Sequence, residues 1–162
     1  MNVFLKLFFF IVFFFQNLQA DVVTHNFKKY PKTKTNFKLQ EFIEGLNYPW
    51  GMTFIDKENL VITEKNGGLL KINIISKKIT QIKHTIKSIP FNGNDQGGFL
   101  DVLYNDGYLY FSYSYEFEEI NKKKYSSTAI ARGKLVDNEI KDLEILLKGQ
   151  TKLTRNIHWG SR

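Results

Sequence analysis

Cysteine is absent from this chain of 162 residues. Its absence excludes disulfide frameworks, thiolate metal sites, cysteine nucleophiles, covalently attached c-type haem and a lipid-bearing N-terminal cysteine within the sequence. A disordered tail and a collagen-like repeat are excluded too, because 43% of the residues are hydrophobic and 24% are charged. We therefore expect a folded protein that packing or bound ligands stabilise.

Arginine is also scarce, although the formal net charge is +7. Only Arg132, Arg155 and Arg162 are arginines, and the lysines are scattered along the chain instead of forming one stripe with interleaved aromatic residues. Proteins that read nucleic acids favour arginine and a concentrated basic face. We therefore expect a solvated, lysine-rich surface and no nucleic-acid partner.

Residues 1–20 have the order of a secretory signal peptide: Lys6, an unbroken apolar run over 7–15, and a small residue, Ala20, at the end. The alternative is an uncleaved anchor, but the run is short of the roughly 20 residues that span a bilayer. We expect cleavage after Ala20, export to the periplasm or the medium, and no stable membrane span afterwards. Residues 21–36 are polar and lack periodicity, which indicates an arm.

From residue 37 onward the sequence indicates short strands and no long amphipathic helix. Asn66-Gly67, between two apolar runs, is typical of a tight hairpin turn, because both turn positions need positive φ. We expect strands at 50–55, 60–64, 69–75, 99–104, 108–115, 127–135 and 139–147, and an imperfect alternation at 37–46. This pattern leaves a sandwich, a barrel or a propeller open. Similar units at 50–75 and 99–115 favour the propeller slightly.

Six segments in order resemble the glucose/sorbosone dehydrogenase family, the soluble aldose dehydrogenases that use pyrroloquinoline quinone (PQQ). They are GLNYPWGMTF (45–54), ITEK with GLLK (62–65 and 68–71), NDQGGFLDV (94–102), YFSYS (110–114), TAIARG (128–133) and NIHWGSR (156–162). The resemblance implies an all-β fold, a six-bladed β-propeller, of which residues 37–162 supply about the first two to three blades. We therefore expect a domain truncated at its C-terminus and inactive alone.

The sequence departs from the family pattern at three positions. Lys65 stands where arginine is common, Asp95 replaces a small residue before Gln96, and Ile157 separates Asn156 from His158. Lysine cannot replace an arginine that forks to a carboxylate. None of the three departures removes a residue with an expected chemical role.

The resemblance places the catalytic base on His158, whose neutral imidazole is suited to accept a proton near pH 7. It places Gln96 at the mouth of the active site, where an amide can orient a sugar hydroxyl or a quinone oxygen. Without the motif, Gln96 fits a plain turn equally well. Arg162 is a weaker candidate, either pairing with a cofactor carboxylate or bracing the loop of His158.

The resemblance also implies the cofactors and partners. PQQ and calcium are expected, with an aldose as substrate and a separate electron acceptor. Calcium needs several oxygen ligands. We expect no metal ligands within this chain, because the family's calcium ligands and cofactor-binding basic residues belong to later blades.

Other conspicuous side chains receive structural interpretations. We expect Trp50, Trp159 and the tyrosines at 108, 110, 113 and 115 to pack the blades, and Glu64 and Asp101 to accept hydrogen bonds. His25 and His84 receive no role.

Two alternative functions remain open. The first is a secreted propeller that binds a partner without redox activity. The second is a lactonase-type hydrolase, which would need channel-facing Asp, Asn and Glu residues in successive blades; these are lacking in this sequence.

Overall fold

The structure is a computed structural model that describes residues 38, 40–91, 93–118, 124–152 and 159. Contacts divide the chain into Met1–Gln40 and Glu41–Arg162, and the elements below all belong to the second unit. The expected signal peptide (1–20) and arm (21–36) lie outside the described residues. Among the residues that are described, no helix has the length and apolarity needed to cross a membrane.

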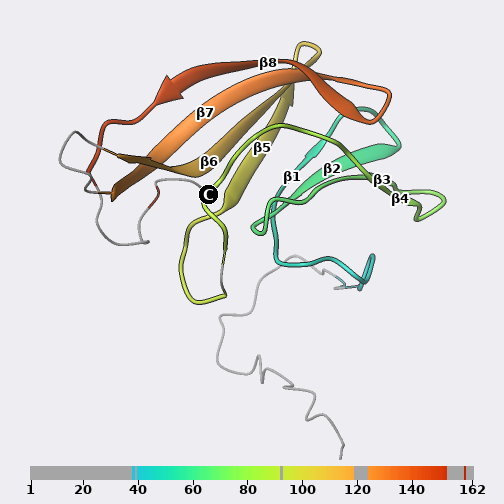
Figure 1. Ribbon diagram of the computed structural model, residues 1–162. Helices are drawn as coiled ribbons and strands as arrows, with labels where there is room; N and C mark the ends of the chain where they lie inside the picture. Colours follow the sequence, from blue (N-terminus) through green and yellow to red (C-terminus); the bar gives the residue numbers. More distant parts are fainter. Residues whose placement is uncertain (1–37, 39, 92, 119–123, 153–158, 160–162) are drawn as a thin grey trace, which may run out of the picture. The chain divides into compact units, whose positions relative to one another are not determined.

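The first sheet contains four antiparallel strands in sequence order (Figure 1). They are β1 (Pro49–Phe54), β2 (Asn59–Glu64), β3 (Leu69–Asn73) and β4 (Ile79–Gln81). The Asp56 carboxylate closes the turn between β1 and β2 by accepting hydrogen bonds from the amides of Glu58 and Asn59, both at 2.7 Å. This capping by a turn aspartate explains why the chain reverses there.

The second sheet repeats this arrangement with longer strands. They are β5 (Phe99–Asn105), β6 (Tyr108–Glu118), β7 (Lys124–Val136) and β8 (Glu139–Lys148). Asp106 and Gly107 have φ values of 47° and 79°, and Asp137 and Asn138 have 47° and 60°. Two successive positive φ values match the right-handed twist of hairpin strands, so both tight turns follow from local sequence.

The predicted all-β fold is confirmed, and each sheet has the four-stranded form of a propeller blade. Of the two to three blades expected, the described residues form two. The expected strands are all present, and only the three-residue β4 was not predicted. No strand forms in the described part of 37–46.

The main core lies between the two sheets. Val61 and Leu69 from the first sheet join Phe99, Leu109 and Phe111 from the second, and each is at most 1% exposed. The first strands of the two sheets approach closely, because a Cβ atom at Gly51 would lie 2.7 Å from Asp101 Oδ1 and 2.8 Å from Asp101 Cα. A glycine is therefore required on β1 at this contact.

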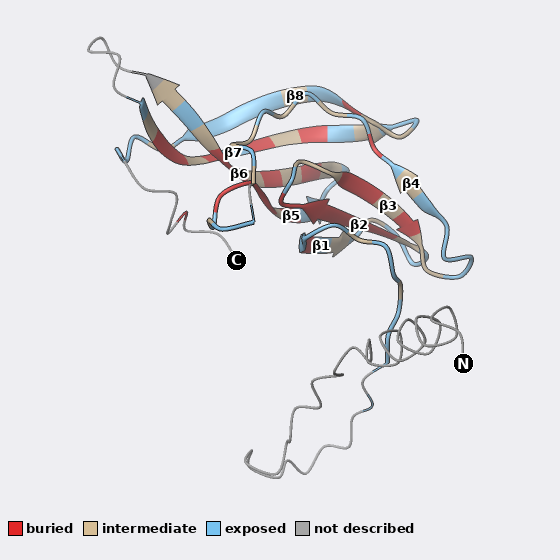
Figure 2. Ribbon diagram, turned by 60° about the horizontal axis from the view of Figure 1, so that its bottom comes forward, coloured by how far each residue is buried: buried red, intermediate tan, exposed pale blue. Residues whose placement is uncertain are grey.

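A second, smaller core covers the other face of the first sheet. Leu60, Ile62 and Ile72 are buried there beneath Ile43 and Leu46 from the segment that precedes β1. The apolar residues of 41–46 therefore pack against the sheet without joining it, which accounts for their imperfect alternation. As a result β2 and β3 are buried along most of their length (Figure 2).

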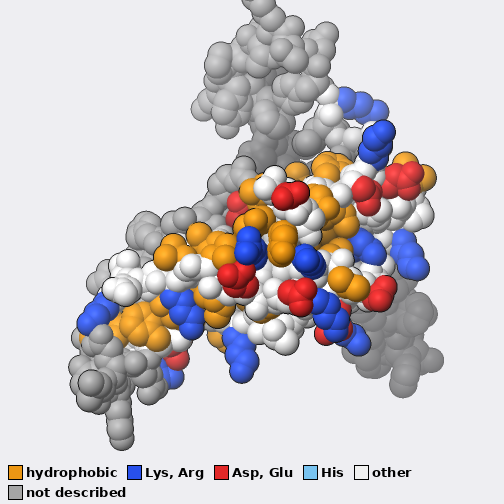
Figure 3. Space-filling model, turned by 90° about the horizontal axis from the view of Figure 1, so that it is seen from above, with side chains coloured by type: hydrophobic (Ala, Val, Ile, Leu, Met, Phe, Trp, Pro, Cys, Tyr) orange, Lys and Arg blue, Asp and Glu red, His pale blue; other side chains and the backbone are white. Residues whose placement is uncertain are grey.

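The outer face of the second sheet is exposed. The strand register places Leu103, Ile130 and Leu147 on this face, at 55%, 37% and 55% exposure. Figure 3 shows hydrophobic side chains mixed with both signs of charge on the upper side of the molecule. Burial on one face explains the alternating pattern of β7.

Candidate functional site

Gln96 lies in the connection between the two sheets, three residues before β5, and is exposed. The loop around it is held by its own side chains, since Asp95 Oδ1 accepts a hydrogen bond from Gly97 N at 3.1 Å. An aspartate that bonds to the backbone two residues later forms a compact turn. The amide of Gln96 is therefore presented at the surface by a fixed loop.

The two glycines after Gln96 allow a close approach of several backbones. Gly98 has a φ of +128°, and a Cβ atom there would lie 2.3 Å from the carbonyl oxygen of Lys65. At Gly97 a Cβ atom would lie 3.1 Å from Ser114 Oγ and 3.2 Å from Trp159 Nε1. Ser114 fastens the loop to β6, because its hydroxyl accepts from Gly98 N at 2.6 Å and its own amide donates to Gly98 O at 3.0 Å.

Lys65 supports the loop from the first sheet. Its side chain is buried, with 6% of the residue exposed, and Nζ donates to the carbonyl oxygen of Asp95 at 3.2 Å. Nζ also lies 4.0 Å from the ring centroid of Phe91 and 4.8 Å from that of Trp50. Burial lowers the pKa of Lys65, and the charge of Asp95 opposes this shift. Two aromatic faces and a carbonyl oxygen thus contact this ammonium group.

Trp159 is buried against the same loop, with 4% exposure. The hydroxyl of Thr128 donates to its carbonyl oxygen, which attaches Trp159 to β7. The Nε1 atom of Trp159 is buried and has no hydrogen-bond partner among the described residues. The loop of Gln96 is therefore surrounded by segments from four parts of the chain: β2, β6, β7 and the C-terminal region.

The comparison with known proteins gives the same assignment as the sequence motifs. Residues 46–162 match the family described as Glucose / Sorbosone dehydrogenase. The chain belongs to this family. A curated protein from Synechocystis sp., named as uncharacterized, is 28% identical over 138 residues, which cover 77% of this chain and 32% of that protein.

Solved structures of a glucose dehydrogenase and of an aldose sugar dehydrogenase have the same fold. One glucose dehydrogenase is 23% identical with a TM-score of 0.63, over 76% of this chain and 36% of its own. The soluble aldose sugar dehydrogenase from Escherichia coli, in its apo-form, is 22% identical with a TM-score of 0.59. This match covers 72% of the present chain and 34% of the Escherichia coli chain. The chain therefore spans about a third of the length of the proteins that it matches.

The departures from the pattern of the glucose/sorbosone dehydrogenase family can now be examined in space. Two of them contact each other, because Lys65 Nζ bonds to the main chain of Asp95. One ammonium group is enough to donate a hydrogen bond to this carbonyl oxygen. The contact does not need the paired donors with which an arginine binds a carboxylate. The third departure, Ile157, lies outside the described residues.

His158 and Arg162 also lie outside the described residues, so their roles remain predictions. The expected hydrogen bonds of the two carboxylates are present: Glu64 Oε1 accepts from Asn47 N at 2.6 Å, and Asp101 Oδ1 from Val102 N at 3.0 Å. Trp159 packs as expected. Trp50 does not, since it is 44% exposed and covers the ammonium group of Lys65 instead of the core.

His84 was not assigned a role, and it links the two sheets. Its Nε2 lies 2.9 Å from the carbonyl oxygen of Gly67, and its ring centroid lies 5.1 Å from that of Phe99. Since a carbonyl only accepts, Nε2 carries the proton. Nδ1 is buried and has no hydrogen-bond partner among the residues that the structure describes. Burial lowers the pKa of His84, opposed by the bond to Gly67. A lone histidine gives no sequence signal for this role.

The two cofactors that the family resemblance implies, PQQ and calcium, do not fit the described residues equally well. A quinone oxygen is suited to the exposed amide of Gln96, which can donate a hydrogen bond to it. Calcium needs several oxygen ligands, and in the part of the chain that the structure describes no group of three or more His, Asp or Glu side chains comes together. The expectation that calcium ligands lie elsewhere stays a prediction.

Proposed function

We propose that this chain forms part of an exported aldose dehydrogenase that oxidises a sugar at C1 to the lactone, with PQQ as hydride acceptor. Membership of the glucose/sorbosone dehydrogenase family supports a sugar substrate. The two-blade fold supports it further, because the dehydrogenases of known structure share that fold over about a third of their length.

One observation carries the proposal of a common site for Gln96 and His158. Trp159, which follows His158 in the sequence, packs against Gly97, which follows Gln96. Motifs that are about 60 residues apart in the sequence therefore meet in the fold. Adjacency of this kind is expected where two residues act on one substrate.

The proposed chemistry divides between the residues and the cofactor. His158 would accept the proton of the C1 hydroxyl, and Gln96 would orient the sugar or the quinone through its amide. The quinone supplies the two-electron acceptor, and its electrons then pass to a separate partner. Arg162 is proposed to brace the loop of His158 or to pair with a cofactor carboxylate.

The test is dye reduction by the natural gene product, reconstituted with PQQ and calcium and supplied with a panel of aldoses. We expect His158→Gln to lower kcat by about 10²- to 10⁴-fold, because the general base is removed, while cofactor binding persists. We expect Gln96→Ala to raise KM more than it lowers kcat. Gln81→Ala, at an exposed glutamine on β4, is the matched control and should change neither constant.

Two results would contradict the proposal. Failure of the reconstituted protein to reduce the dye with every aldose tested would remove the dehydrogenase function. Hydrolysis of a lactone by the same sample would support the lactonase alternative instead.

A further inference from the structure

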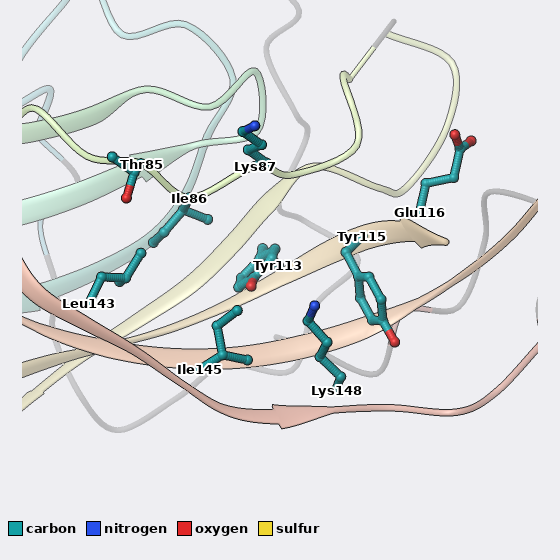
Figure 4. Close-up of a pocket in the computed structure, with 9 residues that line it drawn as sticks. All are labelled: Thr85, Ile86, Lys87, Tyr113, Tyr115, Glu116, Leu143, Ile145 and Lys148. Carbon is teal, nitrogen blue, oxygen red and sulfur yellow. The ribbon is translucent and has the colours of Figure 1, made fainter. Parts of the chain in front are cut away.

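Residues 83–89, here called the strap, cross from one end of the second sheet to the other. At the first end, Lys83 N donates to Asn138 O at 2.9 Å and Lys83 O accepts from Ile140 N at 2.8 Å. At the second end, Ile89 N donates to the carbonyl oxygen of Ser114 on β6 at 2.8 Å. The strap is therefore attached at both ends, and its middle residues are held over the face of the sheet (Figure 4).

A pocket of about 270 Å³ lies between the strap and the sheet. Its lining comes from the strap, β6 and β8 and contains Thr85, Ile86, Lys87, Tyr113, Tyr115, Glu116, Leu143, Ile145 and Lys148 (Figure 4). Apolar cavities of roughly 150 Å³ hold benzene. The volume is thus sufficient for an aromatic ring with one substituent.

The pocket is lined by a tyrosine whose ring is mostly buried. Tyr113 is 5% exposed as a residue, and no hydrogen bond joins its hydroxyl to another described residue. Tyr115 differs, because its hydroxyl donates to Gly149 O at 2.6 Å. Burial raises the pKa of both tyrosines, so each stays a protonated phenol at neutral pH. Tyr113 therefore offers one hydrogen-bond donor to a ligand.

The charged groups around the pocket are predominantly positive. Lys148 lies with Nζ 5.4 Å from the ring centroid of Tyr115, and Lys87 contributes from the strap. Neither forms an ion pair with a described residue. Glu116 forms an exposed ion pair with Lys124, at 2.9 Å. A bound anion would therefore meet two lysines that form no ion pair with another described residue.

We propose that this pocket binds a small organic carboxylate with an apolar body, of about the size of benzoate. The carboxylate would accept a hydrogen bond from Tyr113 and lie near the ammonium group of Lys148. The apolar body would contact Ile86, Leu143 and Ile145. A neutral or cationic ligand would leave the positive charges of Lys87 and Lys148 uncompensated.

The pocket is distinct from the loop of Gln96. Ser114 directs its hydroxyl to Gly98 beside that loop, whereas its neighbours Tyr113 and Tyr115 line the pocket. Successive side chains on a strand point to opposite faces. Binding in the pocket is therefore measurable without the dehydrogenase reaction, and its failure leaves the proposed function untouched.

The experiment titrates the protein with benzoate, followed by ¹H–¹⁵N correlation spectra, with benzamide as the neutral isostere. We expect saturable benzoate binding with shifts concentrated at Ile86, Tyr113 and Leu143, and binding of benzamide at least several-fold weaker. Tyr113→Phe should weaken benzoate binding by about 10-fold, the usual value of a hydrogen bond to a charged group. Lys148→Gln should weaken it by about two- to five-fold, as for an exposed pair.

Lys57→Gln, at an exposed lysine in the turn between β1 and β2, is the matched control and should leave binding unchanged. Circular dichroism establishes that each variant is folded. Lys148 is exposed on β8, so its variant keeps the test valid if Tyr113→Phe fails to fold. The proposal is overturned by absence of saturable binding, by equal binding of benzamide and benzoate, or by unchanged affinity in both pocket variants.

Discussion

The two sheets have the same topology but are stabilised in different ways. In β2, five of six residues are buried, because the main core covers one face and Ile43 and Leu46 cover the other. In β7, buried and more exposed residues alternate, because only one face packs against the core. The comparison teaches that neighbouring segments, and not strand length, decide how far each strand is buried. The shorter sheet is the more completely enclosed one.

The largest expected effect is at the shared core. Phe111→Ala should lower the free energy of unfolding by about 3–5 kcal/mol, because a ring that is 1% exposed leaves a cavity between the sheets. Leu103→Ala, on the outer face of the same sheet at 55% exposure, should cost less than about 1 kcal/mol. Urea unfolding measures both. Similar losses would show that the two faces of the second sheet do not differ.

The next effect tests the junction of the sheets at the loop of Gln96. Gly98→Ala should cost about 3 kcal/mol, because its Cβ atom would meet the backbone of Lys65 at 2.3 Å. Gly67→Ala is the control: φ is 98° there, but no atom lies within 4 Å of the added Cβ. It should cost only about 1–2 kcal/mol from backbone strain. Equal losses for Gly98→Ala and Gly67→Ala would mean that the backbone at the junction of the sheets shifts to accommodate the added methyl group.

A smaller effect compares the second core with the exposed face. Ile72→Val should lower the free energy of unfolding by about 1 kcal/mol, because Ile72 is fully buried beneath Ile43 and Leu46. Ile130→Val removes the same methylene from a residue that is 37% exposed, and should cost a few tenths of a kcal/mol at most. Thermal unfolding of the pair is the measurement. A larger loss for Ile130→Val than for Ile72→Val would contradict the enclosed position of the first sheet.

The smallest expected effect is a pH dependence at His84. Burial lowers its pKa in the folded state below the ordinary value of 6.5, so the unfolded chain binds more protons between the two values. Stability should therefore fall as the pH drops through that window, and this contribution should not change further below the folded pKa. Melting temperatures between pH 7.5 and 5.5 measure the fall. His84→Gln should flatten the curve, and an equally steep curve in the variant would exclude His84 as its cause.

The sequence predicted much of the fold because local rules suffice for hairpins. Asp106-Gly107 and Asp137-Asn138 have positive φ at both turn positions, and the flanking strands follow. At Asn66-Gly67 only Gly67 has a positive φ, so the hairpin is present but positive φ at both positions was wrongly predicted, and residues 65–68 together connect β2 to β3. The strand β4 was not predicted because it has only three residues and is paired to β3 alone. The packing of Ile43 and Leu46 was not predicted either, since it depends on a sheet elsewhere in the sequence.

The sequence alone singled out residues of the candidate site, but it did not predict the contacts that hold them in place. The motif around Gln96 singled out the residue, and Gly97-Gly98 indicated a close backbone approach. Lys65 contacts Trp50 and Phe91 and bonds to Asp95, and these contacts join residues that are up to 45 positions apart. No local pattern reports contacts of this kind.

By itself, the sequence determined the absence of cross-links, the strands and turns, and the resemblance to the glucose/sorbosone dehydrogenase family, because these follow from residue types and their spacing. Only the tertiary structure decided which faces are covered, which lysine is buried, and that Tyr113 lines a pocket while Ser114 supports the loop of Gln96. The physical reason is that desolvation and close approach depend on neighbours contributed by distant segments. Strand periodicity predicts that Tyr113 and Ser114 point in opposite directions, but not what each of them meets.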